Sequence, residues 1–132
     1  MQIFTIHDWL DNSGTYYYHY TSIKNAKKII EDQLLIAKVP KRNQYGSAVF
    51  FTKLKPNSND NDLICNNYIH YSNKFVKKIE CAFAINRNHI ELQNINADRG
   101  RDVWCHRKNV NLKHVEFKLI IRKNKREFEN CL

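Results

Sequence analysis

An aromatic run that passes directly into an amphipathic helix constrains the fold more than any other feature of the chain. Residues 16–22 read YYYHYTS, which is rich in β-prone tyrosine and threonine. Ser22 is a typical helix N-cap, and apolar residues then recur at helical spacing opposite lysines, at positions 23, 26, 29, 30 and 34. The sequence therefore predicts a strand over 16–21, with Tyr17 and His19 on one face, and a helix that follows at once.

Other segments show the alternation of apolar and polar residues that is typical of strands. They are 48–52, 75–85 (one buried face expected), 89–92, 102–106 and 115–122. Segment 61–71 is predicted to form a second helix. This order indicates an α+β fold with a mostly antiparallel sheet and two helices in the N-terminal half. The length of 132 residues fits a single domain, 1–132.

The chain is strongly basic, with 22 lysines and arginines against 13 acidic residues and a net charge of +9. Such a surface attracts nucleic acid, anionic lipid or a phosphate-bearing ligand, and charge alone does not choose among them. The N-terminus lacks the basic start and long apolar run of a signal peptide, and no apolar stretch approaches the ~20 residues of a membrane span. We expect a soluble monomer that is either cytoplasmic or delivered as an effector.

The cysteines give no sign of a metal or redox site. They lie at positions 65, 81, 105 and 131 and show no C-x-x-C spacing. Two disulfides would be possible in a secreted protein, but reduced thiols are the simpler interpretation. His19 likewise has no His or Cys partner at ligand spacing, so we expect no metal.

Two residues are candidates for chemistry. His19 is either a packed strand residue or a neutral hydrogen-bonding group for a ligand hydroxyl. Glu116 lies in the strongest β-pattern, either on a solvated face with Lys118 or as a carboxylate directed into a cleft, where it would stabilise a developing cation.

Three motifs in order resemble the ADP-ribosyltransferase superfamily. His19-Tyr20-Thr21 resembles the His-Tyr-Thr start of its diphtheria-toxin and poly(ADP-ribose) polymerase branch, in compact bacterial toxins. Residues 46–52, GSAVFFT, resemble the Gly-x-Gly-(Ile/Val)-(Tyr/Phe)-Phe strand, and Glu116-Phe117 resembles the final Glu-Tyr-x-Val motif. The resemblance implies a split antiparallel sheet and an enzyme that transfers ADP-ribose from NAD to a protein or nucleic-acid acceptor.

The resemblance also implies a role for each matching residue. His19 would bind a ribose of NAD, and the backbone of Tyr20, with Thr21 nearby, would hold the nicotinamide amide. Phe50 would lie against the nicotinamide ring, with Tyr68 or Tyr71 on its other side. Glu116 would stabilise the oxocarbenium-like transition state. The pyrophosphate would be contacted by Lys24, Arg42 or Arg107, and loop 105–114 would recognise the acceptor.

The sequence also departs from the family pattern. Phe50 stands where Tyr is frequent, so a hydroxyl contact is lost, and Ser47-Ala48 replaces the second glycine. Two other functions remain open at this point. One is an NAD glycohydrolase on the same scaffold, with water as the acceptor. The other is a basic nucleic-acid-binding module without catalysis, in which exposed rings stack on bases.

Overall fold

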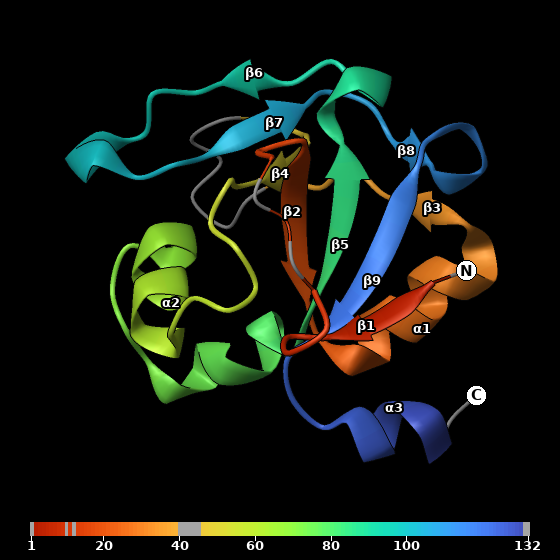
Figure 1. The fold of residues 1–132 in the computed structure, drawn as a ribbon. Helices are drawn as coiled ribbons and strands as arrows, with labels where there is room; N and C mark the ends of the chain where they lie inside the picture. The colour runs from red at the N-terminus through yellow and green to blue at the C-terminus, as the bar shows by residue number, and fades with distance from the viewer. Residues whose placement is uncertain (1, 10, 12, 40–45, 131–132) are drawn as a thin grey trace.

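The computed structural model describes residues 2–9, 11, 13–39 and 46–130 (Figure 1). Its main sheet has the strand order β1 (Ile3–Thr5), β9 (Phe117–Ile121), β5 (Cys81–Asn86) and β2 (Tyr16–Thr21). A second sheet has the order β4 (Val49–Phe51), β7 (Trp104–His106) and β6 (Gln93–Asn94). All these strand pairs are antiparallel except β1 with β9. The predicted α+β class and the mostly antiparallel sheet are confirmed.

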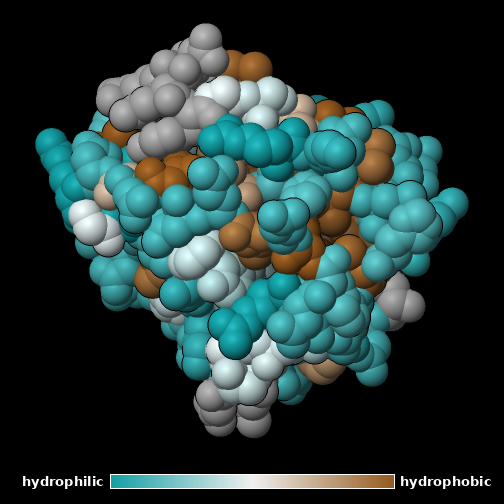
Figure 2. All heavy atoms as spheres, turned by 90° about the horizontal axis from the view of Figure 1, so that it is seen from above, coloured by the Kyte–Doolittle hydropathy of each residue, from teal (hydrophilic) through white to brown (hydrophobic). Residues whose placement is uncertain are grey.

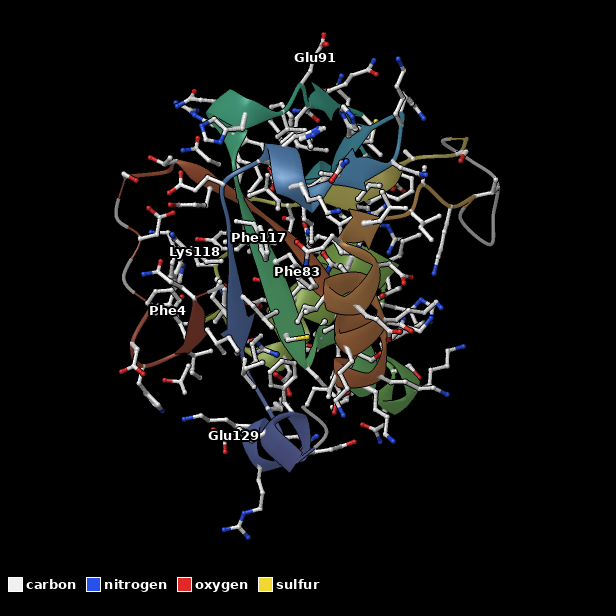
Figure 3. All side chains as sticks on the ribbon, turned by 90° about the vertical axis from the view of Figure 1, so that its right-hand side faces the viewer. Phe4, Phe83, Glu91, Phe117, Lys118 and Glu129 are labelled. Carbon is white, nitrogen blue, oxygen red and sulfur yellow. The ribbon has the colours of Figure 1, made fainter. Side chains whose placement is uncertain are left out.

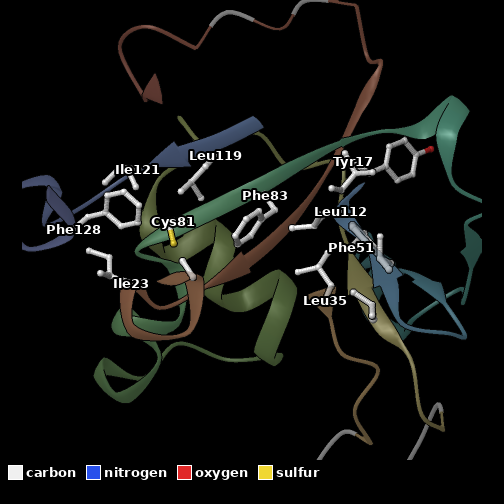
Figure 4. Packing of buried hydrophobic residues seen from close by; sticks show 14 residues of the cluster. Tyr17, Ile23, Leu35, Phe51, Cys81, Phe83, Leu112, Leu119, Ile121 and Phe128 are labelled. Carbon is white, nitrogen blue, oxygen red and sulfur yellow. The ribbon is translucent and has the colours of Figure 1, made fainter. Parts of the chain in front are cut away.

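Helices cover both faces of the main sheet, and the described residues form a hydrophobic core on each face. Helix α1 (Ile23–Asp32) packs on one face, and α2 (Asp60–Tyr68) with the 3₁₀ helix η1 (Asn73–Ile79) packs on the other (Figure 1). Figure 4 shows the first core, in which Phe83 of β5 lies between the side chains of the surrounding elements. The second core contains Leu63 and Ile64 of α2.

Alternation along β2 distributes its tyrosines between these cores, as predicted. Tyr17 belongs to the first core, whereas Tyr18 and Tyr20 belong to the second. Ser22 caps α1 by accepting a hydrogen bond from the backbone N–H of Asn25. The expected strand–cap–helix unit is therefore confirmed.

The predicted strand 75–85 is wrong in its first half. Residues 73–79 form η1, because Phe75 and Val76 lie four and three residues before Ile79 and all three pack on the second core. The strand begins only at Cys81, and both of its faces are buried: Phe83 joins the first core and Ala82 the second. The expectation of one buried face is thereby corrected.

The predicted strand 89–92 is also wrong. The Asn86 side chain accepts a hydrogen bond from the N–H of Asn88 and turns the chain into the 3₁₀ helix η2 (Arg87–His89). The next strand is β6, residues 93–94. The remaining predicted elements form with shifted bounds: 48–52 becomes β4, 61–71 becomes α2, 102–106 becomes β7 and 115–122 becomes β9.

Several short elements have no counterpart in the sequence prediction. Besides β1 they are β3 (Leu34–Leu35) paired with β8 (Val110–Asn111), the 3₁₀ helices η3 (Asp98–Gly100) and η4 (Leu112–His114), and α3 (Lys125–Asn130). α3 places the buried Phe128 in the first core. Within the described ranges, every helix is too short or too polar to cross a membrane.

Candidate functional site at the split between the sheets

The two sheets meet at one β-bridge and then separate. Tyr18 and Thr52 exchange backbone hydrogen bonds of 2.8 and 2.9 Å and so join β2 to β4. In a continued antiparallel ladder, the next hydrogen-bonded pair would be Tyr20 with Phe50. The Phe50 carbonyl is instead 2.8 Å from Nδ1 of the His19 ring. We call this region, where the His19 side chain of β2 reaches the backbone of β4, the split.

The contact with Phe50 fixes the tautomer of His19. A carbonyl oxygen only accepts, so Nδ1 carries the proton and donates it, and Nε2 of the neutral ring is an acceptor. Burial lowers the pKa of His19; the Phe50 carbonyl acts in the opposite direction, and the nearby Lys38 cation lowers it further. The residue keeps partial access to solvent. At neutral pH the split therefore presents a neutral histidine with one acceptor nitrogen.

Two cations lie along the start of β4. Lys38 is exposed, pairs through its backbone with Ala48 and acts electrostatically on His19. An Arg107 guanidinium nitrogen lies 3.5 Å from where a Cβ on Gly46 would be. Of the other expected pyrophosphate contacts, Lys24 is exposed on α1, and Arg42 lies outside the described residues. Lys38 was not among the predicted contacts.

Tyr20 and Thr21 complete β2 beside the split. Because the Tyr18 amide and carbonyl point to β4, alternation directs those of Tyr20 the same way. The Tyr20 side chain is buried on the opposite side, where its hydroxyl donates to the Leu54 carbonyl at 2.6 Å. Thr21 is buried at the end of the strand, next to Cys81. The backbone of Tyr20, and not its ring, is what faces the split.

Asp102 lies at the far end of the β4–β7 pair, just before β7. Its Oδ2 accepts from the Thr52 hydroxyl at 2.8 Å and from the Lys53 N–H, and its Oδ1 accepts from Trp104 Nε1 at 3.0 Å. Asn66 of α2 accepts from the Asp102 N–H at 2.7 Å and donates to its carbonyl at 2.9 Å. Asp102 is therefore fixed against Thr52, the residue that forms the bridge.

An open polar cavity adjoins Asp102. It has a volume of about 310 Å³ and is lined by residues of the segment from β6 through η3 to just before β7: Asn94, Asn96, Ala97, Gly100, Arg101 and Asp102. The face of the molecule over β6 and β7 is largely hydrophilic, with apolar side chains visible between the polar ones (Figure 2). The cavity gives water or a polar group access to the surroundings of Asp102.

The structure does not bring Glu116 to His19. The Glu116 carboxylate accepts from Tyr16 Oη at 3.1 Å and from Asn86 Nδ2 at 2.7 Å, and Lys118 Nζ lies 3.7 Å away. These residues share the sheet face of Tyr18, whereas His19 shares the face of Tyr17. Figure 3 shows the alternation on β9, with Phe117 and Phe83 toward α1 and Lys118 on the other side. The expected common cleft of His19 and Glu116 is not formed.

Glu116 gives a testable pH dependence of stability. The hydrogen bond from Asn86, followed by contacts with Tyr16 and Lys118, lowers its pKa below the ordinary 4.5, although partial burial opposes them. A carboxyl with a lowered folded-state pKa stabilises the fold above about pH 4.5, and this stabilisation is lost as pH falls through the folded pKa.

We therefore expect wild type to lose more free energy of unfolding between about pH 5.5 and 3 than Glu116→Gln does. Urea unfolding at several pH values in this range measures the difference, and other acidic groups contribute equally to both proteins. Parallel curves for the two proteins would show that these contacts do not favour the ionised form.

The two tyrosines predicted to stack on nicotinamide lie at and beyond the end of α2. Tyr68 is stacked on Phe75, with ring centroids 4.2 Å apart and planes 2° from parallel, so one face of its ring is already covered. Burial raises its pKa to about 12. Tyr71 is 45% exposed, and its hydroxyl donates to Asn73. Phe50 itself is partly buried at the split.

Three cysteines fall within the described residues, and all are free thiols: Cys65, Cys81 and Cys105. Burial raises the pKa of Cys81 and of Cys105. The described part of the chain contains no group of three His, Cys, Asp or Glu side chains arranged to hold a metal ion.

Comparison with protein-family models, with curated proteins and with solved structures finds no match for this chain.

Sequence reasoning missed Asp102, Asn66 and Lys38. Asp102 stood at the first position of a predicted strand, close behind Gly100, which is a visible signal of a strand entry but not of a role. Asn66 lies on the predicted helix, yet its partners are 36 residues away in the chain. Lys38 was one of 22 basic residues, and only its pairing with Ala48 places it near His19.

Proposed function

We propose that this chain is an NAD-dependent ADP-ribosyltransferase that binds NAD at the split. The observation that carries the proposal is His19, a neutral ring whose Nε2 accepts beside the Lys38 cation and the backbone of Tyr20. A ribose hydroxyl needs an acceptor, a pyrophosphate needs a cation, and a carboxamide needs backbone donors and acceptors. Together with the sequence resemblance, these three groups favour NAD over other phosphate-bearing ligands.

Cleavage of NAD requires a correctly positioned substrate and one negative charge close to the ribose. Nicotinamide is already a cationic leaving group, so cleavage of its glycosidic bond needs little acid catalysis. Positive charge spreads over the ribose in the transition state, and a fixed carboxylate close to the ribose stabilises it. We assign this role to Asp102 in place of Glu116, because Asp102 is bonded to Thr52, which pairs with Tyr18 next to His19, whereas Glu116 is bonded to Tyr16 and Asn86 at the start of β2.

Asp102 has spare capacity for a ligand. A carboxylate has about four acceptor positions, and three protein donors contact this one: the Thr52 hydroxyl, the Lys53 amide and the Trp104 indole.

Phe50 would lie against the nicotinamide ring. The proposed acceptor is a macromolecule, recognised in part by the basic loop 105–114, and a small basic transferase of this kind suits a toxin or effector.

The polar cavity beside Asp102 favours one alternative. Water that enters this cavity would attack the ribose carbon from which nicotinamide leaves, and the protein would then be an NAD glycohydrolase. NAD labelled on the adenylate, incubated with and without cell lysate, separates the two functions. Label on a macromolecule supports transfer, whereas nicotinamide release without such label supports hydrolysis. No nicotinamide release under either condition contradicts both.

His19→Ala is expected to raise the KM for NAD roughly tenfold, because one hydrogen bond to the ligand is lost. The control is His7→Ala, which removes an exposed histidine in the turn after β1 and should leave KM unchanged. Initial rates of nicotinamide release over a range of NAD concentrations give both values, and circular dichroism checks that both variants are folded. An unchanged KM in His19→Ala would remove His19 from the NAD site.

A further inference from the structure

Aromatic rings and lysines are interleaved on the surface where α2 ends and η1 begins. This ring–lysine patch consists of Tyr68, Tyr71, Lys74, Phe75 and Lys78. Lys74 Nζ lies 5.0 Å from the centre of the Phe75 ring, and Lys78 Nζ lies 5.8 Å from Phe75 and 5.6 Å from Tyr68. Both lysines are exposed, and Tyr71 next to them is the most open ring, at 45% exposed.

The positive charge of this surface has little compensation nearby. Residues 69–79 contain Lys74, Lys77 and Lys78 but no aspartate or glutamate. Among the ion pairs formed by described residues, none includes any of these three lysines, whereas Lys28, Lys118, Lys123 and Lys125 each pair with a carboxylate. Lys74 and Lys78 are instead held over rings, and their ammonium groups stay available to an external anion.

We propose that the ring–lysine patch binds single-stranded nucleic acid. Lys74, Lys77 and Lys78 contact successive phosphates, and a base stacks on the exposed ring of Tyr71. Every base has a π-face, so cations alternating with accessible rings suit a single strand of either sugar type. An acidic peptide would use the charges and not the rings. A duplex would hide its bases from Tyr71, and the groove of B-form DNA would need an inserted element that this patch lacks.

Binding of nucleic acid at the ring–lysine patch does not depend on NAD turnover at the split. The patch and the split are nevertheless joined by α2. Asn66, in the last turn of the helix, holds Asp102, and Tyr68 at its end belongs to the patch. A nucleic-acid strand bound at the patch therefore lies at the same end of α2 that positions Asp102.

The test is fluorescence anisotropy with labelled 12-nucleotide oligo-dT and oligo-U between 50 and 200 mM salt. Lys74→Gln/Lys78→Gln is compared with Lys24→Gln/Lys28→Gln, which removes the same charge from exposed positions of α1, away from any described ring contact. The patch variant should bind at least about fivefold more weakly, with the slope of log K against log salt smaller by roughly 1.4 for two lost phosphate contacts. The α1 variant should stay within about twofold of wild type.

A second variant tests the ring. Tyr71→Ala should weaken binding at least about fivefold with the salt slope unchanged, because stacking on a base is lost while phosphate contacts remain. Equal losses in the two lysine variants, an unaffected Tyr71→Ala, or a duplex of the same length bound as tightly as the single strand would each overturn the proposal. So would binding to vesicles containing phosphatidylserine with no measurable binding to either oligonucleotide.

Discussion

Arg122→Ala is expected to lower the free energy of unfolding by about 3–5 kcal/mol. The Arg122 side chain is only 5% exposed, and its guanidinium donates to three backbone carbonyls and one carboxylate. The carbonyls are those of Pro56, Ile79 and Ser58, at 2.8, 2.8 and 2.9 Å, and the carboxylate is that of Asp60, also at 2.9 Å. Removal of the side chain leaves several of these acceptors without a partner in a poorly hydrated place.

Urea unfolding followed by circular dichroism measures this effect. Arg126→Ala is the matched control, because Arg126 is exposed on α3 and its loss should change stability by less than about 0.5 kcal/mol. Arg122→Lys should recover only a small part of the lost free energy of unfolding, since an ammonium group lacks the fixed fork of donors that reaches all these acceptors. A loss below about 1 kcal/mol for Arg122→Ala would show that these carbonyls find water instead.

Asp102→Asn is expected to lower the rate constant of nicotinamide release at least about 100-fold. The substitution keeps the shape of the side chain but removes the charge that stabilises the ribose cation in the transition state. One oxygen can still accept from Thr52 and Lys53, so the β4–β7 end should stay closed. The introduced NH₂ group faces the Trp104 N–H, so that two donors oppose each other. We expect this mismatch to lower the free energy of unfolding by about 1–3 kcal/mol.

Glu116→Gln is the matched control for Asp102→Asn, since both replace a carboxylate by an amide of the same shape. It should keep nicotinamide release within about threefold of wild type, a change of well under 1 kcal/mol in barrier height. Thermal unfolding of both variants separates a loss of catalysis from a loss of fold. If Glu116→Gln abolishes release while Asp102→Asn does not, the carboxylate assignment is reversed.

Local patterns predicted the parts of the fold that depend on neighbouring residues. The alternation in 16–21 divided Tyr17 and Tyr18 between two faces, and the cores confirm it. Ser22 was recognised as a cap because capping depends on the next three residues. By contrast, η1 satisfies an apolar spacing that also fits the start of a strand, and only packing on α2 decides between a helix and a strand.

The candidate site was harder to predict because it depends on register between distant strands. Alternation alone places Glu116 and Phe117 on opposite faces of one strand, and Tyr18 and His19 on opposite faces of another. The register with β5 decides which of these faces coincide, because Phe83 of β5 pairs with His19 on one side and with Leu119 on the other. Glu116 then falls on the face opposite His19. Asp102 enters the site through side-chain bonds to Thr52 and Asn66, which no periodicity records.

The location of the NAD site is tested most directly by titrating NAD into ¹⁵N-labelled protein and following the backbone amide resonances. We expect the amide resonances of residues 19–21, 50–53 and 102–104 to shift as NAD is added. The amides of Asn86 and of residues 116–118, on the other side of the sheet, should stay in place. Shifts confined to Asn86 and 116–118, or no shift anywhere at millimolar NAD, would contradict the assignment of the split as an NAD site.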